Sequence, residues 1–171
     1  MLLWAAARLQ SVCATVAVNA RLETQAARLA RSSGFPVLHD APGDPDGPLS
    51  GVKAGLAWAQ GLGARALAVS PCDAPLLPQD LFPRLIAAAG EGGAMAVTAE
   101  GRQPLCAVWP VSALARVSAA LAGGAHPPAW RVLEDQGAVM LHFDAPGDFA
   151  NINVPEDLER LEIRLAGHYQ R

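Results

Sequence analysis

Short apolar runs rich in β-branched residues alternate along this chain with segments whose apolar residues recur at helical spacing. Residues 14–18, 36–38 and 66–69 have the length and composition of buried strands. Between them, segments 22–31 and 51–60 place their apolar side chains on one helical face. Because strands that alternate with helices form βαβ units, the pattern predicts an α/β fold with a mostly parallel sheet.

The alternation continues less regularly toward the C-terminus. We expect strands at 94–98, 105–109 and 139–143 and helices at 79–89, 111–122 and 155–166, the last starting at Pro155. The chain has 171 residues, and domains average roughly 150. We therefore expect a single domain over residues 1–171.

Composition excludes several classes of function. The chain has 13 Lys+Arg against 16 Asp+Glu, and Lys53 is its only lysine, so it has no basic stripe for nucleic acid. Cys13, Cys72 and Cys106 form no C-x-x-C motif, which favours reduced thiols in the cytoplasm over disulfides or zinc. The apolar start lacks a preceding basic residue and is interrupted by Arg8. We therefore expect neither export nor a membrane span.

A polar residue closes each of the first three predicted strands. Asn19 follows the first, Asp40 lies just beyond the second, and Asp73 lies just beyond the third. Ligands of open parallel sheets bind outside the carboxyl ends of the strands. We therefore expect Asn19, Asp40 and Asp73 to face one crevice, although any single aspartate there could be an ordinary turn residue.

Asp73 lies between two prolines, Pro71 and Pro75, which fix the backbone on both sides. A rigidly held carboxylate suits Mg²⁺, which binds few protein oxygens and completes its octahedron with phosphates and water. The alternative is a helix cap, but Asp73 is too far from the helix expected near Gln79. The sequence favours a metal ligand.

The run Gly47-Pro48-Leu49-Ser50-Gly51 leads into a predicted helix, with Ser50 as a candidate N-cap. Free amides at a helix start attract an anion or the edge of a base. A Gly-Pro pair before a helix can equally be a simple turn. Lys53, in the same helix, is interpreted as a solvated surface residue.

Asn151 and Asn153 lie two residues apart before the helix expected at Pro155. Residues at i and i+2 of an extended segment project to the same side. Such a pair of amides can hold a ligand or tie down a loop, and the sequence does not distinguish the two.

Three motifs together resemble the molybdenum cofactor guanylyltransferases of the MobA family. They are GPLSGVKAGL from Gly47, PCDAPLLP from Pro71 and NINVPEDL from Asn151. The resemblance implies a three-layer, Rossmann-like nucleotidyltransferase fold. It also implies a reaction in which GMP passes from GTP to Mo-molybdopterin in the presence of Mg²⁺, with release of pyrophosphate.

The resemblance also implies roles for individual residues. Asn19 and Asp40, with Gly47, Pro48 and Leu49, would bind the guanine nucleotide. Asp73 would be the catalytic residue and the ligand of both Mg²⁺ and GTP. Asn151 and Asn153 would bind molybdopterin. The expected protein is a cytoplasmic monomer whose further partners are other cofactor-biosynthesis proteins and molybdoenzyme chaperones.

The chain departs from the family at its start. Family members open with a strand and a loop of the form L-A-G-G-x-S-x-R-M-G-x-D-K, which has no match here, and Met1 to Trp4 correspond to the helix that follows. We expect a missing central strand between those ending at Asn19 and Asp73, and two unpaired edges. Either the true start lies upstream or the gene is truncated. Without the loop's amides and Lys, stabilisation of the leaving pyrophosphate should weaken.

Two alternative functions stay open. One is a molybdopterin cytidylyltransferase or other NTP transferase. The other is a non-catalytic remnant that binds molybdopterin or a partner protein.

Overall fold

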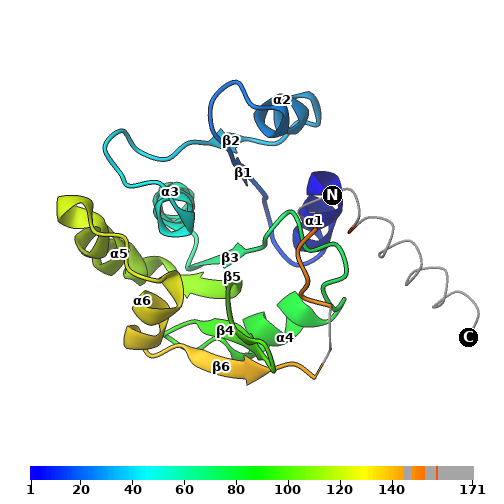
Figure 1. Cartoon of the computed structure of the whole chain (residues 1–171), viewed down its shortest axis with the longest axis vertical. Coiled ribbons are helices and arrows are strands. Elements are labelled where there is room, and N and C mark those ends of the chain that lie inside the picture. The colour runs from blue at the N-terminus through cyan, green and yellow to red at the C-terminus, as the bar shows by residue number, and fades with distance from the viewer. Residues whose placement is uncertain (145–147, 153–156, 158–171) are drawn as a thin grey trace, which may run out of the picture.

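The computed structural model describes residues 1–144, 148–152 and 157, and it contains two separate sheets (Figure 1). The larger sheet has the strand order β3-β5-β4-β6, and the smaller one pairs β1 with β2. The strands are β1 (Val18–Asn19), β2 (Val37–Leu38), β3 (Ala66–Val69), β4 (Ala94–Thr98), β5 (Gly101–Pro110) and β6 (Val139–His142).

Helices precede, link and flank these strands. They are α1 (Leu2–Gln10), α2 (Gln25–Ser32), α3 (Pro48–Gly61), α4 (Leu81–Ala88), α5 (Leu114–Leu121) and α6 (Ala129–Asp135), with short 3₁₀ turns η1 (Val111–Ala113) and η2 (Ala122–Gly124). The periodicity predicted α2 to α5 within a few residues of their bounds but not the seven-residue α6. Of the helix expected from Pro155 to Ala166 only residue 157 is described, and it is helical. None of the described helices is long and apolar enough to cross a membrane.

The larger sheet is covered by helices on both faces, which confirms the predicted α/β fold with three layers. Along β4 and β5 the side chains alternate between two cores. Met95 and Trp109 pack with α3, α5 and α6, while Ala96 and Cys106 pack with α4. Figure 1 shows α4 on the opposite side of this sheet from α3 and α5.

The expectation of a mostly parallel sheet is wrong, because the larger sheet is mixed. β5 runs antiparallel to both β3 and β4, and only β4 and β6 are parallel within it. The cause is local: only two residues, Ala99 and Glu100, join β4 to β5. A two-residue connection makes a hairpin, whereas a parallel pair needs a crossover of a dozen residues or more.

The first predicted strand is much shorter than expected. Of the predicted run 14–18 only Val18 belongs to a ladder, together with Asn19 after it, and the two pair in parallel with Val37 and Leu38. β1 and β2 form a sheet of their own rather than joining β3. Within the described part of the chain, β1 and β3 therefore each keep one unpaired edge, as expected from the sequence.

Candidate functional site

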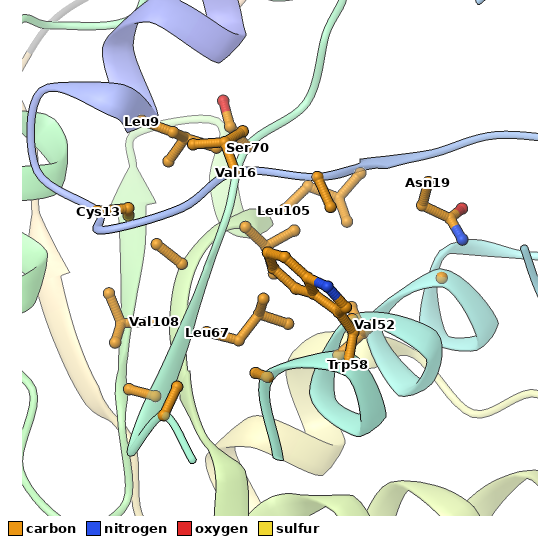
Figure 2. A pocket seen from close by; sticks show the side chains of 18 of the residues that line it. Leu9, Cys13, Val16, Asn19, Val52, Trp58, Leu67, Ser70, Leu105 and Val108 are labelled. Carbon is orange, nitrogen blue, oxygen red and sulfur yellow. The ribbon is translucent and has the colours of Figure 1, made fainter. Parts of the chain in front are cut away.

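A cavity of about 1490 Å³ lies between the two sheets. Its lining includes four of the predicted site residues, namely Asn19, Gly47, Pro48 and Asp73. Figure 2 shows Asn19 at one side of the cavity, and Val16 and Ser70, which directly follows β3, also line it. The ends of β1 and β3 and the start of α3 thus meet at one cavity, which brings Asn19 and Asp73 together as expected. Asp40, the third residue expected in this crevice, is not among its lining residues.

Asn19 and Asp40 form a pair at the ends of β1 and β2. The amide Nδ2 of Asn19 donates to Oδ1 of Asp40 at 3.0 Å, and both residues are exposed. The parallel register of β1 and β2 brings the two strand ends side by side. The pair presents an amide and a carboxylate to solvent. Together these groups can donate to and accept from the polar edge of a ligand.

The start of α3 closely approaches the loop before α6. Gly47 is the N-cap of α3 and has φ 149°. A Cβ at this position would lie 2.1 Å from Nε2 of His126. Nε2 of His126 is buried and has no hydrogen-bond partner in the part of the chain that the structure describes. Only glycine fits here, for reasons of both backbone conformation and space.

The helix starts earlier than the sequence suggested. Ser50 was expected to be the N-cap, but α3 begins at Pro48 and Ser50 lies inside it, donating to the carbonyl of Pro45 at 2.6 Å. No side chain caps the helix at Gly47. The Leu49 side chain is fully buried in the core, so any nucleotide contact of Leu49 would have to use its backbone.

The loop between β2 and α3 is held by an ion pair. Nζ of Lys53 contacts both carboxylate oxygens of Asp44 at 2.7 and 2.9 Å. The two side chains are only 25% and 12% exposed, so the interpretation of Lys53 as a solvated surface residue is wrong. Lys53 instead fixes the loop that carries Asp40 and Gly47. Its spacing of nine residues from Asp44 gave no sequence signal.

The loop after Asp73 is held by a residue that the sequence analysis missed. The guanidinium of Arg8, in α1, donates to the carbonyls of Leu77, Pro78 and Pro75, the last two at 3.3 and 3.2 Å. Burial lowers the pKa of Arg8, and the nearby charge of Asp148 opposes this effect. Arg8 is separated from its three partners by 67 to 70 positions in the chain, so only the fold reveals the contact.

Asp73 also anchors the segment that carries Asn151. Its backbone carbonyl accepts from the amide of Ile152 at 2.7 Å, which brings Asn151 beside Asp73. Asn151 is exposed, and Asn153 lies outside the described residues. The structure therefore brings one of the two predicted amides to the Asp73 loop.

The described residues contain no cluster of three or more His, Cys, Asp or Glu that could hold a metal ion. Among the described residues a divalent ion at Asp73 would therefore have at most two ligands of these types, and phosphate and water would supply the others. Mg²⁺ accepts this arrangement, since it keeps most of its waters and binds through one or two carboxylates. The donor set fits Mg²⁺ that arrives with a nucleotide better than a resident ion.

The charge of Asp73 acts on two thiols. Burial and, second, Asp73 raise the pKa of Cys72, which is exposed beside it. The same two causes raise the pKa of the buried Cys106 to about 12. Both cysteines therefore remain thiols near neutral pH, which does not suit them to nucleophilic catalysis.

Comparison with known proteins gives the same picture as the motifs. Residues 1–139 match the model of the MobA-like NTP transferase domain. A protein of Cereibacter sphaeroides named molybdenum cofactor guanylyltransferase is 42% identical over 163 residues, which is 95% of this chain and 81% of that protein.

Two solved structures share the fold. The molybdopterin-guanine dinucleotide biosynthesis protein A of Archaeoglobus fulgidus superposes with a TM-score of 0.64 at 21% identity, over 87% of this chain and 77% of that one. A 4-diphosphocytidyl-2C-methyl-D-erythritol synthase gives a TM-score of 0.69 at 16% identity, over 96% and 87%. With residues 1–139 matched by the family model and 95% of its length aligned to a relative that is 42% identical, the chain belongs to the MobA-like NTP transferase family.

Proposed function

We propose that this protein is a molybdenum cofactor guanylyltransferase. It would transfer GMP from GTP to Mo-molybdopterin and release pyrophosphate, giving the guanine dinucleotide form of the cofactor. The observation that carries the proposal is 42% identity, over 95% of this chain, to a relative with that name. The geometry supports it, because Asn19, Gly47, Pro48 and Asp73 line one cavity.

The reaction asks for positioning and charge neutralisation rather than a nucleophilic side chain. A phosphate oxygen of molybdopterin attacks the α-phosphorus of GTP, and the bond from that phosphorus to the bridging oxygen of pyrophosphate breaks. The proposed site fits this requirement, since its cysteines are thiols near neutral pH and it presents amides and carboxylates.

The nucleotide would bind where β1, β2 and α3 meet. The Asn19–Asp40 pair offers an amide and a carboxylate that are 3.0 Å apart and exposed. A carboxylate accepts two adjacent N–H donors, such as those on a guanine edge, and a cytosine edge lacks that pair. Gly47 leaves room for close approach to the start of α3.

Asp73 would hold Mg²⁺ together with the phosphates of GTP. When bound, the ion would neutralise charge that develops on the leaving pyrophosphate. Arg8 keeps the following loop in place through the carbonyls of Pro75, Leu77 and Pro78. Asn151, beside Asp73, would contact molybdopterin, and Asn153 would follow it on the same segment.

The proposal includes a setting for this reaction. The three cysteines are free, which fits a reducing compartment such as the cytoplasm. We propose a monomer that acts on GTP and Mo-molybdopterin. It would hand its product to other cofactor-biosynthesis proteins or to molybdoenzyme chaperones.

The test compares nucleotides and one substitution. With Mg²⁺ present, GTP should raise the melting temperature of the protein, and CTP and ATP should not. Transfer of label from α-³²P-GTP to Mo-molybdopterin should fall at least about 100-fold in Asp73→Asn, because one metal ligand is lost. Asp80→Asn is the matched control, because Asp80 is an exposed carboxylate nearby whose side chain makes no cap bond at the start of α4.

Each alternative function has its own outcome. A melting shift and transfer with CTP in place of GTP would identify a cytidylyltransferase. A shift with Mo-molybdopterin alone, and none with any nucleotide, would identify a non-catalytic binding protein. Equal loss of transfer in Asp73→Asn and Asp80→Asn would remove Asp73 from its proposed role.

A further inference from the structure

One polar atom beside the candidate site is buried without a partner. Nε2 of His126 makes no hydrogen bond to any residue that the structure describes. His126 belongs to the segment between η2 and α6, in which Ala125 and Pro128 are exposed. Buried polar atoms are nearly always paired, so an unpaired one needs a physical explanation. The explanation lies in what the ring contacts.

The tip of the His126 ring points at Gly47. A Cβ built on Gly47 would overlap Nε2 and the two ring carbons bonded to it, Cε1 and Cδ2, and Nε2 is the nearest of the three. The hydrogen that glycine carries in place of a side chain is therefore directed at Nε2. A close Cα–H contact of this kind is a weak hydrogen bond when the facing atom offers a lone pair.

This contact identifies the nitrogen that carries the proton of the neutral ring. A neutral imidazole has one N–H group and one nitrogen with a lone pair. An N–H group at Nε2 would collide with the hydrogen of Gly47, whereas a lone pair accepts it. Nδ1 of the same ring is not buried, so water can accept a proton there. The neutral ring of His126 therefore carries its proton on Nδ1 and directs an acceptor at Gly47.

Gly47 separates this ring from the cavity. Gly47 and Pro48 line the cavity, and His126 does not. The ring therefore contacts Gly47 from outside the space that a ligand would occupy. Because the imidazole does not reach into the cavity, its effect on a ligand there must pass through the position of Gly47.

Gly47 depends on contacts from other residues to keep its position. Its φ of 149° lies in the region that favours glycine, and glycine changes backbone conformation at low cost. Among the described residues no side chain forms a cap hydrogen bond at this end of α3. The Lys53–Asp44 ion pair anchors the preceding loop at Asp44 and not at Gly47 itself. The ring of His126 therefore restrains a residue that the ion pair leaves free.

We propose that His126 is a positioning residue for nucleotide binding, which holds Gly47 and the start of α3 in the place where the nucleotide docks. The inference rests on the proposed function, in which the nucleotide closely approaches Gly47. A helix start that is already in place needs no ordering when the nucleotide arrives, so the nucleotide binds more tightly. His126 itself contacts neither substrate and takes no part in the chemical step.

The first test measures transfer of GMP from GTP in variants of His126. His126→Ala should raise KM for GTP at least about 10-fold and leave kcat and KM for Mo-molybdopterin within about twofold of the parent chain. His126→Gln should recover most of the affinity, because its Oε1 presents an acceptor in a similar place. His142→Ala is the matched control, since His142 is exposed at the end of β6. An unchanged KM for GTP in His126→Ala would overturn the proposal. So would an equal loss in kcat, because a general structural defect affects both constants.

The second test uses the free protein without any nucleotide. The amide of Ser50 donates to the carbonyl of Gly47 at 3.2 Å, so its hydrogen exchange reports whether Gly47 stays in place. In His126→Ala this amide should exchange at least about 10-fold faster. The amide of Leu62, which donates to the carbonyl of Trp58 at the other end of α3, should keep its rate. Equal acceleration at both amides would mean a loss of overall stability and would overturn the proposal.

Nitrogen chemical shifts of the His126 ring provide a third measurement. At a pH where the ring is neutral, Nε2 should have the shift of an unprotonated nitrogen and Nδ1 that of a protonated one. The opposite assignment would overturn the proposal, since an N–H group cannot face Gly47. Neither the shifts nor the exchange rates depend on nucleotide transfer. A parent chain that transfers no GMP, with exchange at Ser50 still faster in His126→Ala, would contradict the proposed function and support the contact between His126 and Gly47.

Discussion

At the scale of single residues, Asp73 controls the chemistry of its neighbour. Burial is the largest cause that raises the pKa of Cys72, and the negative charge of Asp73 is the second. Removing that charge lowers the thiol pKa, so more thiolate is present at a given pH. We expect Asp73→Asn to accelerate alkylation of Cys72 by iodoacetamide several-fold at pH 8.

Cys106 serves as the control in the same experiment. It is buried and its pKa is raised to about 12, so it should stay unlabelled in the folded protein. The pH profile of Cys72 labelling should move to lower pH in Asp73→Asn. An unchanged profile would show that the carboxylate does not act on this thiol. Added Mg²⁺ and GTP should produce a similar acceleration in the parent chain only.

Gly47 allows a second prediction about a single residue. Gly47→Ala would force a Cβ to 2.1 Å from Nε2 of His126, at a backbone φ of 149°. We expect a loss of about 2–3 kcal/mol in the free energy of unfolding, measured by urea denaturation. Gly61 is the last residue of α3, and a Cβ added there would have no heavy atom of another residue within 4 Å. Gly61→Ala should therefore leave the free energy of unfolding unchanged or raise it.

A double variant separates the two causes. In Gly47→Ala with His126→Ala the contact with the ring disappears, but the backbone strain remains. Stability should therefore return only in part. Complete recovery would mean that the conformation of Gly47 costs nothing in an L-residue.

At the scale of elements, α1 acts as a brace for the Asp73 loop. Arg8 bonds to three carbonyls of residues 75–78. Arg8→Met leaves these acceptors without their donor, so we expect the free energy of unfolding to fall by about 2 kcal/mol. Limited proteolysis should then cut within the loop first, since local opening follows lost contacts.

Two substitutions test whether the geometry of the guanidinium matters. Lysine keeps the charge but has no planar fork, so Arg8→Lys should recover less than half of the lost stability. Arg31→Met, at an exposed position in the last turn of α2, should change stability by less than about 0.5 kcal/mol. Equal effects of Arg8→Met and Arg31→Met would contradict the brace.

At the scale of the whole molecule, the sequence predicted the positions of helices and strands better than the directions of the strands within the sheet. Periodicity located α3 and β3, because burial of one face leaves a pattern in the residues themselves. It did not predict the reversal of β5, which depends on a two-residue turn at Ala99 and Glu100 that no hydrophobic pattern records. The direction of a strand depends on the length of the connection before it. Here that connection is the short turn between β4 and β5.

The candidate site also combines features that the local sequence predicts with features that it does not. The positions of Asn19 and Asp73 after strands predicted that both would line one cavity, since strand ends carry that information. They did not predict that Asp40 would lie outside that lining, bonded to Asn19. The contacts of Arg8 with the Asp73 loop and of Lys53 with Asp44 join residues whose spacing matches no helix or strand period. Such contacts depend on how the elements pack, which the local sequence does not encode.

The single lysine has a practical consequence. Its ammonium group is engaged by both oxygens of Asp44, and its side chain is only 25% exposed. Acylation of Lys53 should therefore be slow in the folded protein and fast once the chain opens. The degree of acylation at this one position, read by mass spectrometry, would report how often the loop around Asp44 comes apart.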